Sequence, residues 1–318
     1  MPVLVYTESE QGNFKKAALE AASYGKAVAD AMGTTLIALT FKVSDASELG
    51  NYGVDKVLNI NSTTPFNAKI YADAIKQATE KENATVVILS ASADSRYLAP
   101  LVSVGLSAGY APNVVGTPSS LSPFIVKRTA FTNKAFCNTE LSTAIKIIGV
   151  SNNSFGLVEN KAAAQIEAFA PSLATSSTNV TFTDKASDKV TIADAEVVVS
   201  AGRGLKGPEN WGMIEELADV LGAATACSKP VSDLGWRSHS EHVGQTGKPV
   251  AANLYIAIGI SGAIQHLAGI NSSKVKVVIN TDPEAPFFKA ADYGIVGDAF
   301  EVVPKLIEKL KVFKAQNA

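Results

Sequence analysis

Short apolar segments alternate with longer amphipathic segments through the first part of the chain. Residues 3–6, 35–39, 57–60 and 85–89 are short runs rich in β-branched and aliphatic side chains, which predicts strands. Residues 14–32 and 68–81 carry apolar side chains at helical spacing, which predicts amphipathic helices. Strands that alternate with helices form βαβ units, so this part predicts an α/β domain with a mostly parallel sheet.

The pattern changes after residue 124. Residues 125–128, 135–139 and 144–148 are strand-like, and no amphipathic helix separates them. Neighbouring strands without a crossover helix are typical of antiparallel pairing. We therefore expect these segments to form an antiparallel extension of the same sheet.

A polar stretch with little periodicity runs between residues 171 and 194. Domain boundaries fall in such segments, and a chain of 318 residues exceeds the size at which a single core usually stops growing. We expect an N-terminal α/β domain over residues 1–184 and a second domain over residues 185–318. In the second domain, strands are predicted at residues 196–200, 254–258 and 275–280, and helices at 209–221, 262–267 and 302–313. This alternation predicts a Rossmann-like α/β fold.

Composition narrows the function. The chain is 47% hydrophobic and 18% charged with a formal net charge of -2, so no basic excess favours nucleic acid as a partner. The longest apolar run, residues 254–264, is too short for direct membrane insertion, and the N-terminus lacks an export signal, so we expect a soluble, cytoplasmic protein. Cys137 and Cys227 are too far apart in sequence to suggest a disulfide framework or clustered metal ligands. Redox chemistry would therefore need an organic cofactor.

Two glycine-containing turns could approach a ligand. Gly202-Arg203-Gly204 and Gly207 lie between a predicted strand and a helix, which could be a ligand turn or only a strand cap with a solvated Arg203. A nicotinamide site is disfavoured because no acid follows about 20 residues later. In residues 254–266 a strand, a glycine turn and a helix follow one another, with Ser261 as the expected N-cap, a pattern that favours an anion such as pyrophosphate.

Histidines and a polar loop are further candidates. His266 on that helix could bind a ligand or pack in the core, and residues 243–247 could be a ligand loop or only a turn. His239 and His242 are three residues apart, but no further ligands stand nearby in sequence, so we expect no metal site. No nucleophile-elbow pattern supports a hydrolase.

Taken together, these segments resemble the electron-transfer flavoprotein alpha family in order and spacing. The motifs are Gly202-Arg203-Gly204, Val243-Gly244-Gln245-Thr246-Gly247, and the runs at residues 254–266, 279–288 and 291–298. The resemblance is dense from residue 200 onward and extends to the fold over the first domain. It implies that residues 185–318 form an FAD-binding domain.

The resemblance also implies roles for individual residues. Arg203 would lie against the isoalloxazine ring, and the segments beside it would line the ring, with the Thr246 hydroxyl near N5. The ring-lining residues would be Ser228, Val243, Gly244, Gln245 and Thr246. The diphosphate turn would comprise Ser261, Gly262, Ala263, Ile264, Gln265 and His266, with His266 at the pyrimidine edge, while Asn280, Asp298 and Ala299 would secure the adenosine. Lys229 stands where the family commonly has arginine; it keeps the charge without the planar guanidinium, which bears on the flavin potential but not on binding.

The family implies an electron carrier and not an independent enzyme. Such a chain pairs with a beta subunit, which is expected to contact the N-terminal domain, residues 1–184, and to hold AMP or a second FAD. The complex accepts electrons from acyl-CoA-type flavin dehydrogenases of fatty acid beta-oxidation and passes them to a quinone oxidoreductase. Three alternatives stay open: a nicotinamide-dependent oxidoreductase, a nucleotide-binding module without flavin, and a bifurcating member with a second FAD.

Overall fold

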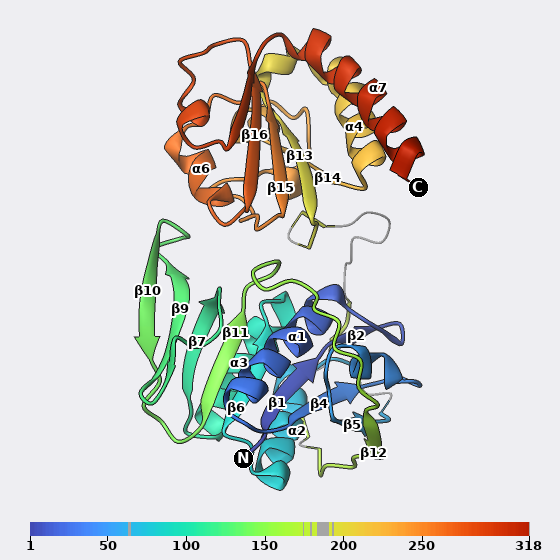
Figure 1. Ribbon diagram of the computed structural model, residues 1–318, viewed down its shortest axis with the longest axis vertical. Coiled ribbons are helices and arrows are strands. Elements are labelled where there is room, and N and C mark those ends of the chain that lie inside the picture. Colours follow the sequence, from blue (N-terminus) through green and yellow to red (C-terminus); the bar gives the residue numbers. More distant parts are fainter. Residues whose placement is uncertain (63–64, 174, 179, 183–190, 193, 318) are drawn as a thin grey trace. The chain divides into compact units, whose positions relative to one another are not determined.

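The chain forms two compact units (Figure 1). The computed structural model describes residues 1–62, 65–173, 175–178, 180–182, 191–192 and 194–317. Unit 1 comprises residues 1–130 and 135–183, and unit 2 comprises residues 131–134 and 184–318. The boundary predicted at residue 185 lies outside the described residues. The α/β class expected for both units is confirmed.

Unit 1 is built on a ten-stranded mixed sheet with the order β10-β9-β7-β11-β6-β1-β4-β5-β12, and β8 pairs with β9. In the part of the sheet with the order β7-β11-β6-β1-β4-β5-β12, all neighbouring strands are parallel. The pairings that involve β8, β9 and β10 are antiparallel. The strands are β1 (Val3–Thr7), β4 (Leu36–Phe41), β5 (Lys56–Ile60), β6 (Val86–Ser90), β7 (Gly109–Val114), β8 (Ser120–Leu121), β9 (Phe124–Ala130), β10 (Ala135–Glu140), β11 (Lys146–Val150) and β12 (Gln165–Ala168). A separate hairpin joins β2 (Ser9–Glu10) and β3 (Asn13–Phe14).

The predicted antiparallel extension is only partly correct. β9 and β10 form it, but β11 lies between β6 and β7 and is parallel to both. The reason is burial: residues 147–150 are all buried, as expected for a central parallel strand and not for an exposed edge.

Helices cover both faces of the unit 1 sheet. One core cluster lies under α1 (Lys16–Ala31), and the other lies under α2 (Ala68–Glu82) and α3 (Ala93–Gly105) (Figure 1). A short 3₁₀ segment, η1 (Ser47–Asn51), precedes β5. The side chain of Asn67 caps α2 by accepting from the backbone N–H groups of Lys69 and Ile70, and Asn83 ends that helix with a left-handed φ of 52°.

Unit 2 is a smaller sheet in which all neighbouring strands are parallel. Its order is β14-β13-β15-β16-β17, with α4 and α7 on one face and α6 on the other (Figure 1). The strands are β13 (Val197–Ala201), β14 (Ala224–Cys227), β15 (Leu254–Ile258), β16 (Val275–Asn280) and β17 (Tyr293–Val296). The helices are α4 (Gly212–Leu221), α5 (Lys229–Asp233), α6 (Ile264–Ile270) and α7 (Ala299–Asn317), with 3₁₀ turns η2 (Arg203–Leu205), η3 (Pro208–Trp211), η4 (His239–Glu241) and η5 (Pro286–Lys289).

Strand order reverses once near the start of each sheet. In unit 1 the chain runs from β1 to β4 and β5 on one side, and β6 then returns to the other side of β1. In unit 2 it runs from β13 to β14 on one side, and β15 returns to the other side of β13. Ligands of open α/β sheets bind outside the carboxyl ends of the strands at such reversals, so each unit has one place where a site is expected.

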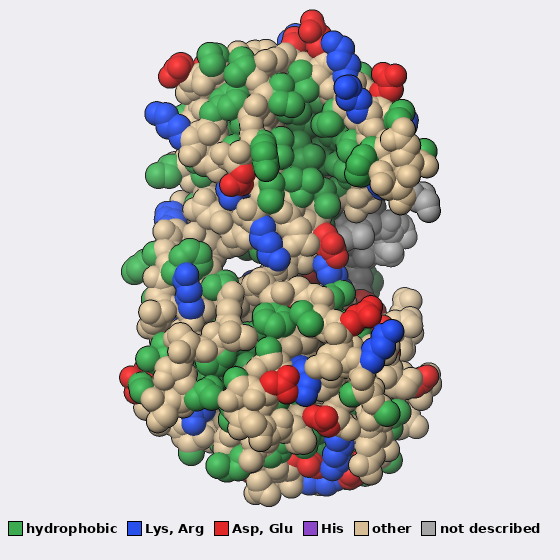
Figure 2. Space-filling view, in the orientation of Figure 1, with side chains coloured by type: hydrophobic (Ala, Val, Ile, Leu, Met, Phe, Trp, Pro, Cys, Tyr) green, Lys and Arg blue, Asp and Glu red, His purple; other side chains and the backbone are tan. Residues whose placement is uncertain are grey.

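The outer edge of unit 2 is apolar and open to solvent. All four residues of β17 are exposed, including Tyr293, Ile295 and Val296. Hydrophobic side chains also gather on the face of unit 2 that is visible in Figure 2. An exposed edge strand with apolar side chains is an unusual feature for a surface and is typical of contact regions.

Candidate cofactor-binding site

A cavity of about 670 Å³ opens at the carboxyl ends of the unit 2 strands, where the strand order reverses. Residues that follow four of the strands line it, together with one loop and the start of α6. These are Arg203 and Gly204 after β13, Ser228, Lys229 and Pro230 after β14, Gly259, Ile260, Ser261 and Ala263 after β15, Asn280 and Asp282 after β16, residues 242–246, and Gln265 and His266 of α6. The volume lies within the range of ordinary cofactor sites.

Glycines allow the ends of β13 and β15 to meet beneath the cavity. A Cβ atom on Gly202 would stand 2.3 Å from the carbonyl oxygen of Gly259, and one on Gly204 would stand 2.6 Å from the Cα of Gly259. Gly259 itself has a φ of +61°, a conformation that other residues rarely adopt. The two strand ends therefore require glycine at this point, for steric reasons that do not depend on a ligand.

The loop of residues 243–246 is fastened to two elements. The Val243 N–H donates to the Cys227 carbonyl at 3.0 Å, and the Gln245 N–H donates to the Gln265 carbonyl at 2.7 Å. A Cβ on Gly269 of α6 would lie 2.6 Å from the Cα of Gly244, so loop and helix are in backbone contact. This fastening fixes the loop along one wall of the cavity.

The turn before α6 differs from the prediction. Ser261 is not the N-cap: α6 begins at Ile264, its N-cap is Ala263, and no side chain caps it. The cause is Gly262, whose φ of +85° turns the chain against the backbone of Phe287, while the Ser261 carbonyl accepts from the Phe287 N–H at 3.0 Å. Among the described residues, the backbone N–H groups of residues 262–265 find no acceptor. Such free donors suit an anionic ligand.

His266 is a buried, neutral group at the cavity wall. Its Nε2 lies 3.0 Å from the hydroxyl of Tyr255, which is wholly buried. The backbone of Val243 lies near the ring, and Nδ1 makes no hydrogen bond of normal geometry to a described residue. Burial is the main cause that lowers the pKa of His266 to about 4, so the imidazole is uncharged at neutral pH. The imidazole can form a hydrogen bond with a ligand but does not contribute a positive charge.

Positive charge at the cavity comes from Arg203 and Lys229. Both side chains are exposed and line the cavity. Within the described part of the chain, neither lies within ion-pair distance of a carboxylate. Their charges are therefore available to a ligand.

Comparison with known proteins identifies the family. Residues 3–174 match the model of the electron transfer flavoprotein domain, and residues 191–271 match that of the electron transfer flavoprotein FAD-binding domain. The alpha subunit of electron transfer flavoprotein from Bacillus subtilis (strain 168) is 35% identical over 315 residues, which cover 97% of both chains. This chain belongs to the electron transfer flavoprotein alpha-subunit family.

Other alpha subunits agree with this assignment. The one from Syntrophomonas wolfei is 33% identical over 314 residues, covering 96% of this chain and 98% of its own. The one from Paracoccus denitrificans is 57% identical over 124 residues, covering 39% of this chain and 40% of its own. In the described part of this alpha chain, no helix has both the length and the hydrophobicity needed to cross a membrane.

Most residues that the sequence predicts for the cofactor site of the alpha chain line the cavity, and their roles stay predictions. The lining residues among them are Arg203, Ser228, Lys229, Val243, Gly244, Gln245, Thr246, Ser261, Ala263, Gln265, His266 and Asn280. Gly262, Ile264, Asp298 and Ala299 do not line it. Asp298 instead accepts from the Phe300 N–H at 3.0 Å at the start of α7, and Ala299 is buried in the core. The structure thus shows a capping hydrogen bond for Asp298 and core packing for Ala299, and their contact with adenosine stays a prediction.

Several lining residues were not predicted as site residues. They are Gly204, Pro230, His242, Gly259, Ile260 and Asp282. All but His242 lie within three residues after the carboxyl end of a strand, so strand ends at the reversal would have been the signal to use. His242 has no such signal, because its place depends on a backbone bridge to Cys227 that sequence does not reveal.

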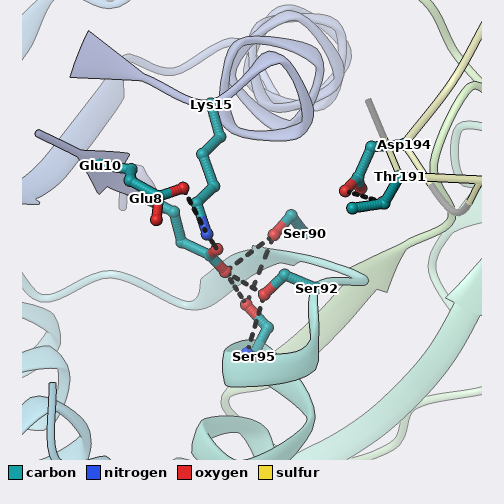
Figure 3. A network of polar contacts seen from close by, with 8 residues as sticks. All are labelled: Glu8, Glu10, Lys15, Ser90, Ser92, Ser95, Thr191 and Asp194. Atoms are coloured by element: carbon teal, nitrogen blue, oxygen red, sulfur yellow. Dashed lines mark hydrogen bonds and ion pairs between the residues drawn. The ribbon is translucent and has the colours of Figure 1, made fainter. Parts of the chain in front are cut away.

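The corresponding edge of unit 1 holds a carboxylate of the chain itself (Figure 3). Glu8 follows β1 and is buried, and its Oε1 accepts from the hydroxyls of Ser90 at 3.0 Å, Ser95 at 2.6 Å and Ser92. Lys15 Nζ lies 3.6 Å from the other oxygen, Oε2. Ser92 also caps α3, since its hydroxyl accepts from the Ser95 N–H. An internal anion therefore occupies the position where a ligand is expected in unit 1.

Proposed function

We propose that this chain is the FAD-carrying subunit of a heterodimeric electron carrier. It would accept electrons from acyl-CoA-type flavin dehydrogenases and pass them to a quinone oxidoreductase, without converting a substrate of its own. One observation carries the proposal: the cavity lies at the strand reversal of the unit matched by the FAD-binding domain, and it combines unpaired cations with free backbone donors.

The residues present fit FAD. The free N–H groups of residues 262–265 suit a diphosphate, and the glycine contacts between Gly204 and Gly259 leave backbone without side chains beside it. Asn280 Nδ2 donates to the Ile260 carbonyl at 3.1 Å, which ties the end of β16 to this turn. Bound FAD would supply a ring that takes up and releases electrons.

The side chains at the ring end would set its electrostatics. By the family pattern, Arg203, Ser228, Lys229 and residues 243–246 surround the ring. A cation held near a ring that gains negative charge stabilises the reduced state and raises the potential. His266, neutral and fixed by Tyr255, would offer a hydrogen bond at the pyrimidine edge without adding charge.

The beta partner completes the proposal. Alpha subunits of this family imply a beta subunit, and we propose that it holds AMP or, in a bifurcating complex, a second FAD. The exposed apolar strand β17 is compatible with a chain that works in a complex. Electrons from fatty acid oxidation are the expected supply.

The test is to co-express the chain with its beta subunit, purify the complex and count bound FAD and AMP. We expect the visible absorbance of oxidised flavin, one FAD assigned to this chain and no binding of NADH. A complex that stays colourless after incubation with excess FAD contradicts the proposal. AMP without flavin would favour a nucleotide-binding module, and NADH binding that is lost on changing Arg203 would favour a nicotinamide enzyme.

A further inference from the structure

His242 is a cavity residue with no role so far. It follows η4 and pairs in a parallel bridge with Cys227, which fixes its backbone beside the end of β14. The Lys248 N–H donates to its carbonyl at 2.8 Å. Only 7% of His242 is exposed, and its imidazole lies against Gly244 and Gly247, where added Cβ atoms would stand 3.3 Å from Nε2 and 3.0 Å from Cγ. The ring therefore has a fixed place in the cavity wall.

The hydrogen bonding of His242 differs from that of the other two histidines. His239 Nδ1 lies 2.8 Å from the Ser232 hydroxyl, and His266 Nε2 lies 3.0 Å from the Tyr255 hydroxyl. Neither ring nitrogen of His242 makes a hydrogen bond to a residue in the described part of the chain. Because His242 lines the cavity, these nitrogens are free to bind water or a ligand there.

Burial and the groups around His242 lower its pKa, so its imidazole is neutral as long as the cavity holds no added negative charge. Burial is the largest cause that lowers its pKa, and the positive charge of Lys229 and the neighbouring His239 lower it further, while Asp233 opposes them. Across the loop, His266 is neutral, and the Cys227 thiol is also neutral because burial raises its pKa to about 12. Glu241 precedes His242 in the chain, but its carboxylate is engaged by Arg237 at 2.9 Å. An anion placed in the cavity would therefore act on an imidazole that can still accept a proton.

Resting on the proposed function, we propose that His242 takes up a proton from water when the ring in this cavity gains an electron. The electron comes from the reduced flavin of a donor dehydrogenase, and the proton binds a ring nitrogen of His242. When the electron leaves for the acceptor, the proton returns to water. Negative charge arriving within about 4–6 Å raises a histidine pKa by about 1–3 units, so electron and proton uptake stabilise each other.

The coupling predicts how the potential depends on pH. Between the pKa of His242 before reduction and its higher pKa after reduction, the potential for the first electron falls as pH rises. The slope reaches at most about 59 mV for each tenfold change in proton concentration. Outside this window, the contribution of His242 to the slope disappears.

The experiment uses the FAD-loaded heterodimer and measures this potential by spectroelectrochemistry across a pH series. In His242→Gln, which cannot titrate, the slope should be lost within the window that the wild-type protein shows. His239→Gln is the matched control, because its ring is held by Ser232 and does not line the cavity. It should keep a slope of wild-type size, in a window moved to higher pH because one group that lowers the His242 pKa is removed. Independently, NMR of isotopically labelled histidine should show the His242 pKa rising by about 1–3 units on reduction.

Two results would overturn the proposal. One is a His242→Gln complex that holds FAD and keeps the wild-type pH dependence. The other is a His242 imidazole whose pKa is the same in the oxidised and the reduced complex. A wild-type complex without FAD removes the proposed function and this inference together, and the flavin count shows that outcome before any potential is measured.

Discussion

The two units have the same kind of strand reversal but fill it in opposite ways. In unit 1, Glu8 and three serine hydroxyls close the carboxyl edge with side chains of the chain itself. In unit 2, Gly202, Gly204 and Gly259 place bare backbone there, and a cavity of about 670 Å³ remains. A strand-order reversal thus provides a place where a ligand can bind. The side chains at the strand ends determine whether that place is filled or stays open as a cavity.

The difference is also electrostatic. Lys15 in unit 1 faces the carboxylate of Glu8 at 3.6 Å, so its charge is already balanced within the chain. Lys229 and Arg203 in unit 2 have no carboxylate partner among the described residues and face the cavity. In unit 1 the negative charge that balances the lysine comes from Glu8. In unit 2 the matching negative charge has to come from a ligand.

The largest expected effect comes from filling the glycine contact in unit 2. Gly202→Ala would put a Cβ 2.3 Å from the Gly259 carbonyl oxygen, where backbone cannot yield without moving β13 from β15. We expect loss of bound FAD and destabilisation of unit 2 by about 1–3 kcal/mol or more. Flavin content and tryptophan fluorescence measure both, because the two tryptophans of the chain, Trp211 and Trp236, lie in unit 2.

The matched control is Gly212→Ala in the same unit. Gly212 begins α4, and an added Cβ would meet nothing within 4 Å. Alanine there should leave FAD bound and stabilise the helix by about 0.5–1 kcal/mol. Equal flavin content in the two alanine variants would show that the glycine contact does not shape the site.

The next effect is on the closed edge of unit 1. Glu8→Ala leaves the hydroxyls of Ser90 and Ser95 without their carboxylate acceptor and removes the nearer of two carboxylates beside Lys15, so we expect a loss of about 3 kcal/mol. Hydrogen exchange in β1 and β6 should accelerate while tryptophan fluorescence and FAD content stay at wild-type values. Glu8→Gln, which keeps a carbonyl acceptor, should lose less.

Glu10→Ala is the control for that variant. Glu10 is exposed and lies 3.9 Å from Lys15, and exposed pairs contribute about 0–1 kcal/mol. If Glu8→Ala exchanged its β1 amides no faster than Glu10→Ala, the serine network would not be what closes this edge.

The parts of the fold that could be predicted are those with a strong burial pattern. β15 and β16 have the bounds that the sequence predicted, because their mainly apolar runs are bordered by a glycine turn or by polar residues. β14 and β17 were missed: each has only four residues, so neither is long enough for a strand pattern to stand out in the sequence. β11 was found but paired wrongly, since a strand's neighbours are set by long-range burial and not by its own residues.

The site likewise has parts that could be predicted from the sequence and parts that could not. Local motifs located Arg203 and the loop at residues 243–246, because their glycines and order are visible in one dimension. The start of α6 was misplaced, because the packing of Gly262 on Phe287 delays the helix and only the folded chain shows that contact. The position of His242 likewise depends on its bridge to Cys227.

The smallest expected effect is that of removing the charge of Lys229, which has no carboxylate partner among the described residues. Lys229→Ala should lower the potential for the first electron, because it removes a cation that favours added negative charge on the ring. A full interaction of about 1.4 kcal/mol equals about 60 mV, and since Lys229 is exposed and screened by solvent, we expect less than that. The difference between the two proteins should shrink further at 1 M salt, where the Debye length is about 3 Å.

Lys15→Ala completes the comparison, because the same substitution removes a lysine whose charge is balanced by Glu8. It should leave the potential unchanged and weaken only unit 1, whereas Lys229→Arg should keep or raise the potential, since arginine retains the charge and adds a planar donor group. Spectroelectrochemical titration of the four FAD-loaded proteins, wild type included, measures the potentials, and hydrogen exchange in β1 measures the stability of unit 1. If Lys229→Ala and Lys15→Ala gave the same potential as the wild type, then the cation at the open edge would be as isolated from the cofactor as the cation at the closed one, and tuning would have to be assigned to Arg203 and the hydrogen bonds of the ring.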